Sequence, residues 1–317
     1  MKNYSKELGT FLKNYINTNS LSFVREDPYT FVSRLSKMFS PFFILSDEDT
    51  LAENALIEGL KEKALYCLWN TVIDDTIEYS DRGKDSVVES FEALTKFRKG
   101  ENFNGKTEVG QVTYDLICQF HSLFPGPNKK ISEELIFLDL IRIINGLDYE
   151  RIIHENNTMG TLSEYMEFGA ITADVRVLLD IDIAIYPHDL DLFIIGELRE
   201  AYRWFDLAFK LNSDIVTFER EYFVEASQNA VILHGQEKEL LPRNILTAEN
   251  THKEQFFECV IPSLMNEIGE KGKEYLNKSI ECLEKISEID TSTISAAFRS
   301  AFETYPGERT FSPPPDK

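Results

Sequence analysis

Two acidic stretches decide how this chain is interpreted. They are Asp74-Asp75-Thr76-Ile77-Glu78 and Ser213-Asp214-Ile215-Val216-Thr217-Phe218-Glu219-Arg220-Glu221. Both lie in segments with helical periodicity, where residues four apart stand one turn above each other on one face. Asp74 and Glu78 therefore share one helix face. Ser213, Thr217 and Glu221 share another, so the sequence predicts two oxygen-rich helix faces.

Oxygen-rich faces on two separate helices suit magnesium ions. Mg²⁺ takes hard oxygen ligands, keeps several waters and is commonly completed by substrate phosphates. The formal net charge is −21, from 54 acidic and 33 basic residues, which disfavours nucleic acid as a partner because such binders carry a basic footprint. Divalent cations bridge carboxylates to phosphate oxygens, so an acidic protein can still bind a diphosphate.

Composition predicts one all-α domain over residues 1–317. Hydrophobic residues make up 43% of the chain, glycine is scarce with 15 residues, and no composition shift marks a second domain. No apolar run reaches the roughly 18 residues of a membrane span, and the N-terminus lacks a signal-peptide core, so we expect a cytoplasmic protein. The 4 cysteines lack CxxC spacing, which indicates free thiols rather than a zinc site or disulfides.

Helical periodicity, punctuated by glycine and proline, predicts the individual elements. The expected helices cover residues 3–18, 29–40, 48–79, 84–98, 108–124, 131–155, 161–186, 189–235, 251–268 and 271–302. The C-terminal tail, residues 306–317, contains three consecutive prolines, and we expect it to be mobile.

Aromatic side chains gather along the sequence near the two motifs. Most aromatics at helical spacing are core residues. The functional alternative is an apolar cavity whose π faces stabilise a carbocation, by about 0.5–2 kcal/mol per contact. The candidate cavity residues are Tyr66, Trp69, Tyr165, Phe168, Trp204 and Phe205.

These residues resemble the class I terpene synthases (terpene cyclases) of microbial type. Residues 74–78 match their aspartate-rich motif in its DDxxE form. Residues 213–221 resemble their second metal motif, (N/D)Dxx(S/T)xxx(K/R)E, and the two motifs stand in the family's order. Asn229 also fits a frequent family position and joins the cavity candidates. The likeness spans roughly residues 45–305 and implies a helical bundle around an apolar active-site cavity.

The resemblance implies an enzyme, a carbon–oxygen lyase acting on phosphates. Such an enzyme ionises a linear prenyl diphosphate, here farnesyl or geranylgeranyl diphosphate, and cyclises the carbocation to a sesquiterpene or diterpene. The expected cofactor is a group of about three Mg²⁺ ions bound with the diphosphate, with Mn²⁺ as a substitute. Many family members are dimers, so a homodimer is an expected assembly.

Individual roles follow from the resemblance, residue by residue. The implied metal ligands are Asp74, Asp75 and Glu78 from the first motif and Ser213, Thr217 and Glu221 from the second. Arg220 would donate to the diphosphate, a task that suits a planar guanidinium. With Arg176, discussed below, Asp74 and Arg220 are the expected catalytic residues.

The second metal motif departs from the family pattern at its first position. Ser213 stands where Asn or Asp is usual, and a serine hydroxyl is shorter and less basic. Asn212 or Asp214 could rearrange to help. Asp214 faces about 100° away from Ser213 on an ideal helix, which makes that substitution imperfect.

The diphosphate-binding arginines depart from the pattern as well. Gly169 stands at about the position of the family's diphosphate-sensing arginine. Arg176 could replace it only if the helix breaks or shifts there; the alternative is an ordinary surface arginine. Family members carry a C-terminal Arg-Tyr pair that is absent here, and Arg309 is the remaining candidate.

Two other functions stay open. The first is another isoprenoid enzyme, a prenyltransferase or a head-to-head synthase, although elongating enzymes normally carry two DDxxD motifs. Asp180 and Asp182 do not supply the missing motif, and we expect them to be solvated or helix-end acids. The second is a non-catalytic synthase-like binding protein, suggested by Ser213 and Gly169.

Overall fold

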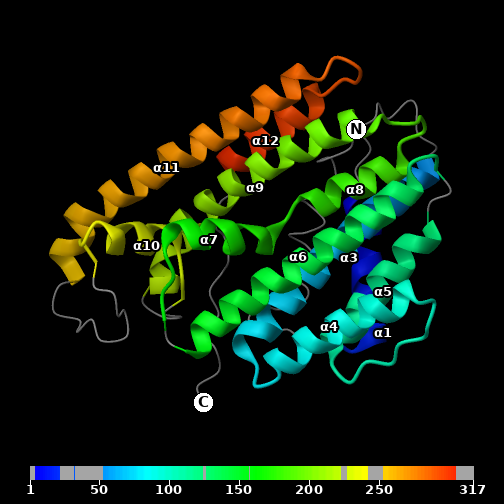
Figure 1. Ribbon diagram of the computed structural model, residues 1–317, viewed down its shortest axis with the longest axis horizontal. Helices are drawn as coiled ribbons and strands as arrows, with labels where there is room; N and C mark the ends of the chain where they lie inside the picture. The colour runs from blue at the N-terminus through cyan, green and yellow to red at the C-terminus, as the bar shows by residue number, and fades with distance from the viewer. Residues whose placement is uncertain are drawn as a thin grey trace.

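The long helices of the protein lie side by side in one bundle (Figure 1). The computed structural model describes residues 4–21, 32, 53–123, 126–156, 158–222, 227–241 and 253–304, and every regular element in these ranges is helical. The first half contains α1 (Ser5–Asn19), α3 (Glu53–Tyr79), α4 (Gly83–Arg98), α5 (Glu108–Leu123) and α6 (Lys129–Glu155). The second half contains α7 (Leu162–Phe168), the 3₁₀ helix η1 (Gly169–Ala173), α8 (Arg176–Ile185), α9 (Leu192–Arg220), α10 (Ala230–Glu237), α11 (Lys253–Lys285) and α12 (Ser292–Thr304). The prediction of an all-α fold is confirmed.

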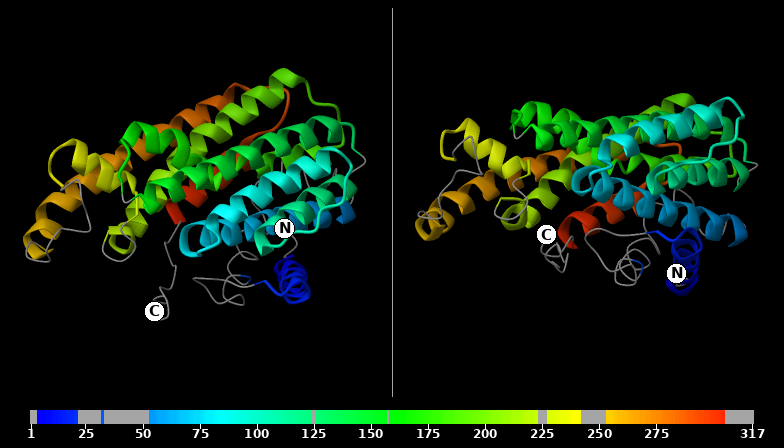
Figure 2. Two further views of the ribbon diagram at one scale, coloured as in Figure 1. Left: turned by 60° about the horizontal axis from the view of Figure 1, so that its bottom comes forward. Right: turned by 90° about the horizontal axis from the view of Figure 1, so that it is seen from below.

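The helices form two groups that share an interior. The helix α9 packs along α11, with α12 beside them, and α3 lies among α4, α5, α6 and α8. The helix α1 packs on α3 and crosses the long helices, as the right-hand view of Figure 2 shows. Among the described helices, none is long and apolar enough to cross a membrane.

Two hydrophobic clusters fill the described interior. The larger one, here called the main cluster, joins α1, α3 to α6, α8, the N-terminal part of α9, α11 and α12, and it includes Ile73 and Ile77. The smaller one, here called the α10 cluster, joins α7, the C-terminal part of α9, α10 and α11, and it includes Tyr165 and Phe218. The first motif therefore lies on the main cluster and the second motif on the α10 cluster.

Most predicted helices are present within a few residues of the expected bounds. This holds for the elements seen as α1, α4, α5 and α6. The helix α3 begins at Glu53, and residues 48–52 of its expected range lie outside the described residues. The predicted helix 29–40, apart from Val32, and the tail 306–317 also lie outside them.

The predicted single helix over 161–186 is wrong, because this segment breaks into α7, η1 and α8. The first turn of α7 is capped by Thr161, whose hydroxyl oxygen accepts the N–H of Glu164 at 3.1 Å. The chain leaves helical geometry at Asp174, with φ −53° and ψ 102°. Apolar residues continue on both sides of the break, so the hydrophobic pattern does not reveal it.

A close contact between helices explains one glycine in this part of the fold. A Cβ on Gly146 of α6 would lie 2.8 Å from the carbonyl oxygen of Phe168, so only glycine lets η1 approach this closely. The boundary that we predicted between 268 and 271 is wrong, because α11 continues through it. A Cβ on Gly272 would make an ordinary van der Waals contact, 3.4 Å from the Phe302 ring of α12.

The predicted helix over 189–235 also divides. The helix α9 ends at Arg220, and α10 begins at Ala230. Asn229 starts α10 by accepting the N–H of Val231 on its side-chain oxygen. This division places the last residue of the second motif just beyond the end of α9.

Candidate metal and diphosphate site

The two motifs lie at the C-terminal ends of α3 and α9. Both of these ends point toward the same end of the molecule, the left-hand side of Figures 1 and 2. The fold therefore places the two motifs at a common end of the bundle.

The first motif is carried by a helix whose other face is deeply buried. Asp74 is partly exposed, whereas Asp75 is only 3% exposed. Ile73 and Ile77 belong to the main cluster, so this turn of α3 is anchored on both sides of the acidic pair. The side chain of Glu78 lies outside the described residues.

The second motif presents hydroxyl groups along the last turns of α9. The Thr217 hydroxyl donates to the carbonyl oxygen of Ser213 at 2.9 Å, which fixes the direction of its proton. Thr217 is buried and Ser213 is partly buried. Among the described side chains, no three of His, Cys, Asp and Glu gather as a metal cluster. Two of the three ligands expected from the second motif, Ser213 and Thr217, are hydroxyl groups. A cluster defined by His, Cys, Asp and Glu does not count them.

Asp214 faces the protein interior rather than the Ser213 face. Its Oδ2 accepts the Tyr165 hydroxyl at 2.9 Å and the N–H of Ala230 at 2.8 Å, and Lys210 Nζ lies 3.3 Å from Oδ1. Burial raises the pKa of Asp214 to about 6, and Glu221 adds to the rise, against the opposing effects of Lys210, the Ala230 N–H and Tyr165. Asp214 is thus committed to holding α7, α9 and α10 together.

Asn212 is committed elsewhere as well. Its Nδ2 donates to the carbonyl oxygen of Phe302 in α12 at 3.0 Å. Asn212 and Asp214, the two neighbours of Ser213, are therefore both held by contacts with other helices. In this structure neither takes the place of the longer Asn or Asp side chain that Ser213 lacks.

The end of the second motif forms a small polar group with α10. Arg220 Nη2 donates to Glu221 Oε1 at 3.0 Å. Asn229 Nδ2 donates to Glu221 Oε2 at 2.7 Å. The Glu221 carboxylate is thereby held through both of its oxygens. Asn229, expected as a cavity residue, makes its contacts with α9 and α10.

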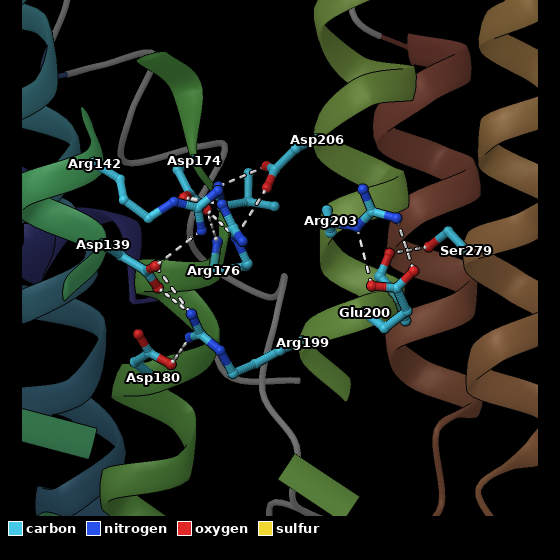
Figure 3. Close-up of polar contacts among 12 residues, drawn as sticks. Asp139, Arg142, Asp174, Arg176, Asp180, Arg199, Glu200, Arg203, Asp206 and Ser279 are labelled. Atoms are coloured by element: carbon cyan, nitrogen blue, oxygen red, sulfur yellow. Dashed lines mark hydrogen bonds and ion pairs between the residues drawn. The ribbon is translucent and has the colours of Figure 1, made fainter. Parts of the chain in front are cut away.

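Arg176 lies at the break between η1 and α8, buried against acidic side chains (Figure 3). Its Nε donates to Asp174 Oδ1 at 2.8 Å and its Nη2 pairs with Asp174 Oδ2. Its Nε also lies 3.6 Å from Asp206 Oδ2. Burial raises the pKa of Asp206 well above its ordinary value, and Asp174 raises it further, whereas Arg176 and the Val175 N–H lower it. Arg176 is therefore neither a surface arginine nor directed outward.

A second arginine is held by two carboxylates next to it. Arg199 Nη1 donates to Asp180 at 2.7 Å, and its Nη2 donates to Asp139 at 2.9 Å (Figure 3). Burial raises the pKa of Asp180 well above its ordinary value; Arg199 opposes this rise and Asp139 reinforces it. Each arginine thus lies between two buried carboxyl groups.

The expectation that Asp180 and Asp182 are solvated is wrong, because both are buried in α8. Asp182 pairs with the buried Lys63 of α3. A signal for this was present in the sequence: α8 is apolar on all sides apart from these acids, so its acids had to be buried with cations.

The predicted aromatic residues point to several different neighbours. Tyr66 donates to the carbonyl oxygen of Asp174 at 2.6 Å, and Trp69 donates to the Thr113 hydroxyl at 2.8 Å. The Phe205 ring stacks on Phe298 of α12, with centroids 3.9 Å apart. Phe168 stacks on Tyr149 of α6, with centroids 5.1 Å apart, and Tyr165 binds Asp214.

Trp204 lies between α9 and α11 with cations beside its ring. The guanidinium carbon of Arg203 is 4.6 Å from the ring centroid, and Lys278 Nζ is 4.8 Å away. Tyr275 packs against the same indole at 5.4 Å between centroids. These contacts attach α11 to α9. The last arginine candidate, Arg309, lies outside the described residues.

Comparison with solved structures identifies the fold. The structure is similar to the SVS_A2 protein from ancestral sequence reconstruction, with TM-score 0.71, 12% identity, and 98% of this chain and 87% of that chain covered. It is also similar to linalool/nerolidol synthase from Streptomyces clavuligerus in complex with 2-fluorogeranyl diphosphate, with TM-score 0.68, 9% identity, and 95% and 98% covered. A third similar structure is 2-methylisoborneol synthase from Streptomyces coelicolor A3(2) in complex with Mg²⁺ and geranyl-S-thiolodiphosphate, with TM-score 0.62, 9% identity, and 98% and 93% covered.

The chain thus has the class I terpene synthase fold, as the sequence motifs predicted. No family model and no curated protein matches the sequence. At these identities the likeness concerns the fold.

Proposed function

We propose that this protein is an Mg²⁺-dependent terpene cyclase. It ionises a linear prenyl diphosphate, farnesyl or geranylgeranyl diphosphate, cyclises the carbocation to a sesquiterpene or diterpene, and releases diphosphate. The observation that carries the proposal is that α3 and α9, in a class I terpene synthase fold, place two oxygen-rich motifs at the same end of the bundle. Support also comes from two solved structures of similar fold, one bound to 2-fluorogeranyl diphosphate and one to Mg²⁺ with geranyl-S-thiolodiphosphate.

The residues of the two motifs fit magnesium by the chemistry of their donor atoms. Asp74, Asp75 and Glu78 would hold it from α3, and Ser213, Thr217 and Glu221 would hold it from α9. All six offer oxygen, the ligand that Mg²⁺ prefers, and none offers a soft sulfur or nitrogen donor. The Thr217 proton is engaged by a backbone carbonyl, which leaves the lone pairs of its oxygen for a cation.

The protein and its cations would share the work of ionisation. Bound Mg²⁺ supplies positive charge where negative charge develops on the leaving diphosphate. We propose Arg220 as an additional donor to the diphosphate, because its planar guanidinium belongs to the second motif and lies beside Glu221. A diphosphate-binding role for Arg176 would require its guanidinium to leave Asp174, and that role, like the role of Arg309, stays a prediction. Closure of the site would exclude water from the cation.

The test is product analysis of the purified protein. It is incubated with geranyl, farnesyl, geranylgeranyl and geranylfarnesyl diphosphate, with Mg²⁺ or with EDTA, and the products are separated by gas chromatography and mass spectrometry. A cyclic hydrocarbon or alcohol that disappears with EDTA is the expected result, and it also gives the substrate length. Diphosphate release without a cyclic product would indicate a prenyltransferase. Binding without turnover would indicate a non-catalytic relative.

A further inference from the structure

Asn229 joins two helices at the second motif. It precedes α10 with φ −157°, and its side chain is fully buried. Its Oδ1 accepts the N–H of Val231 at 2.8 Å, which caps the first turn of α10. Its Nδ2 donates to the carbonyl oxygen of Asp214 and to Glu221 Oε2, both at 2.7 Å. The acceptor therefore serves α10, while both donors serve α9.

Helix capping accounts for only one of these three contacts. A cap needs a single oxygen acceptor, which Ser, Thr or Asp provides as well as Asn. The Nδ2 group adds two N–H donors on the same rigid plane, and it reaches α9 because the acceptor is fixed on α10. The choice of an amide at residue 229 thus fits a second task, which is holding the Glu221 carboxylate.

Two side chains fix the position of the Glu221 carboxylate. Glu221 directly follows α9 and keeps helical dihedral angles, φ −69° and ψ −33°. Arg220 holds Oε1 and Asn229 holds Oε2, which orients the carboxylate from two sides. A Glu side chain loses rotamer freedom when it is fixed, and a carboxylate that is already oriented does not lose that freedom again on binding a ligand. Because Asn229 is neutral, it orients Glu221 and leaves the negative charge for a cation.

We propose that Asn229 is a positioning residue of the second metal motif, whose amide holds the Glu221 carboxylate in the orientation that receives a divalent cation. This inference rests on the proposed function, because it takes Glu221 as a metal ligand. The contacts of Asp214 allow the positioning role of Asn229 to be tested separately from its role in folding. Asp214 Oδ2 binds the Ala230 N–H and the Tyr165 hydroxyl, so α10 keeps an independent attachment to α9 when the amide is lost.

The test uses two variants and a matched control. Asn229→Asp and Asn229→Ser both keep an oxygen that caps α10 and lose the NH₂ group. Asp191→Ala is the control, because it removes a cap at the other end of α9, where Asp191 Oδ1 accepts the Phe193 N–H at 2.7 Å. Calorimetry would measure Mn²⁺ affinity in the presence of inorganic diphosphate, and circular dichroism would measure melting. We expect about 10-fold or greater loss of affinity for both Asn229 variants, the size typical of a lost ligand-orienting contact. We expect wild-type affinity for Asp191→Ala.

A double variant tests whether Asn229 acts through Glu221. Adding Asn229→Ser to Glu221→Ala should cause no further loss of Mn²⁺ affinity, a result that a general destabilisation would not give. Affinity within about twofold of wild type for both Asn229 variants, in a protein that binds and turns over, would overturn the positioning role and leave the proposed function standing. Loss of the helical spectrum in both variants would also overturn it, because Asn229 would then be a residue of the fold. A wild-type protein that neither binds Mn²⁺ with diphosphate nor forms product would overturn both proposals.

Discussion

Asp206 Oδ1 accepts a 2.7 Å hydrogen bond from the backbone N–H of Val175, which lies 31 residues earlier in the chain. Asp174 accepts the next amide, the N–H of Arg176, at 2.9 Å. Together the two carboxyl groups replace the intrahelical acceptors that the first amides of α8 lack. The break between η1 and α8 is thus stabilised from inside by the same acids that hold Arg176.

The two acids of this group should respond differently to neutralisation. Asp206 contacts Arg176 through one oxygen at 3.6 Å, a longer contact than those Asp174 makes with two nitrogens of the same guanidinium. Asp206→Asn keeps the side-chain shape and an oxygen that can accept the Val175 N–H. We expect this variant to lie within about 1 kcal/mol of wild type in free energy of unfolding. Asp174→Asn removes the anion that binds Arg176 through two nitrogens, and it should cost about 3–5 kcal/mol.

Urea unfolding at pH 7 measures both changes. Each variant serves as the matched control of the other, because both replace one carboxyl group with an amide at the same break in the chain. Equal losses for Asp206→Asn and Asp174→Asn would contradict the assignment of Asp174 as the main partner of Arg176.

The buried pair of Lys63 and Asp182 predicts the direction of a pH dependence. Burial raises the pKa of Asp182 from 3.8 to about 7, against the opposing effect of Lys63. The folded protein therefore holds this proton more tightly than the unfolded chain does. The resulting stabilisation is fully present below about pH 4 and is lost as the pH rises through about 7, with a slope of at most about 1.4 kcal/mol per pH unit for one proton.

Denaturant unfolding across this pH range checks the contribution of Asp182. The double variant Lys63→Met/Asp182→Leu replaces the pair with apolar groups of similar volume, which is often neutral or stabilising. In this double variant, the free energy of unfolding should lose the part of its pH dependence that comes from Asp182. A double variant with the wild-type pH profile would show that Asp182 does not titrate in this range.

The two metal motifs predict loss of turnover without loss of structure. Asp74 and Glu221 are both partly exposed, so Asp74→Ala or Glu221→Ala should leave the helical spectrum and the melting curve nearly unchanged. Under the proposed function, each should abolish product formation, because each removes a proposed anionic ligand of Mg²⁺. Full activity in both variants would show that the metal ligands are misassigned.

Position 213 gives a milder test of the second motif. Ser213→Asn introduces the longer amide that the family pattern has there, so activity should be equal or higher. A large loss of activity would mean that the motif is misaligned on α9.

Trp204 predicts a change in stability rather than in product. Its indole lies beside Arg203, Lys278 and Tyr275 on the face of α9 that meets α11. Trp204→Ala should lower the free energy of unfolding by about 1–3 kcal/mol, because it removes aromatic and cation–π contacts. The product ratio from gas chromatography should not change. A new product ratio at unchanged stability would make Trp204 a cavity residue, as the sequence suggested.

The sequence predicted the fold class and most helices, because helical periodicity and the two motifs are patterns among residues that are close in sequence. It did not predict the break in 161–186, since the acceptor for Val175 comes from Asp206 on another helix. It also did not predict the burial of Asp180 and Asp182, whose cations, Arg199 and Lys63, are distant in sequence. For the candidate site, the motif residues and Asn229 were proposed from the sequence and stay predictions. The link from Asn229 to Glu221 depends on how α10 docks on α9, which no local pattern encodes.

The division of the interior into a main cluster and an α10 cluster has a consequence for local unfolding. Because the α10 cluster is the smaller one, we expect it to open at lower free energy than the main cluster. Amide hydrogen exchange should therefore proceed sooner in α7 and α10 than in α3 and α8. The second motif would then stand on the part of the fold that opens first, and the first motif on the part that stays closed longest.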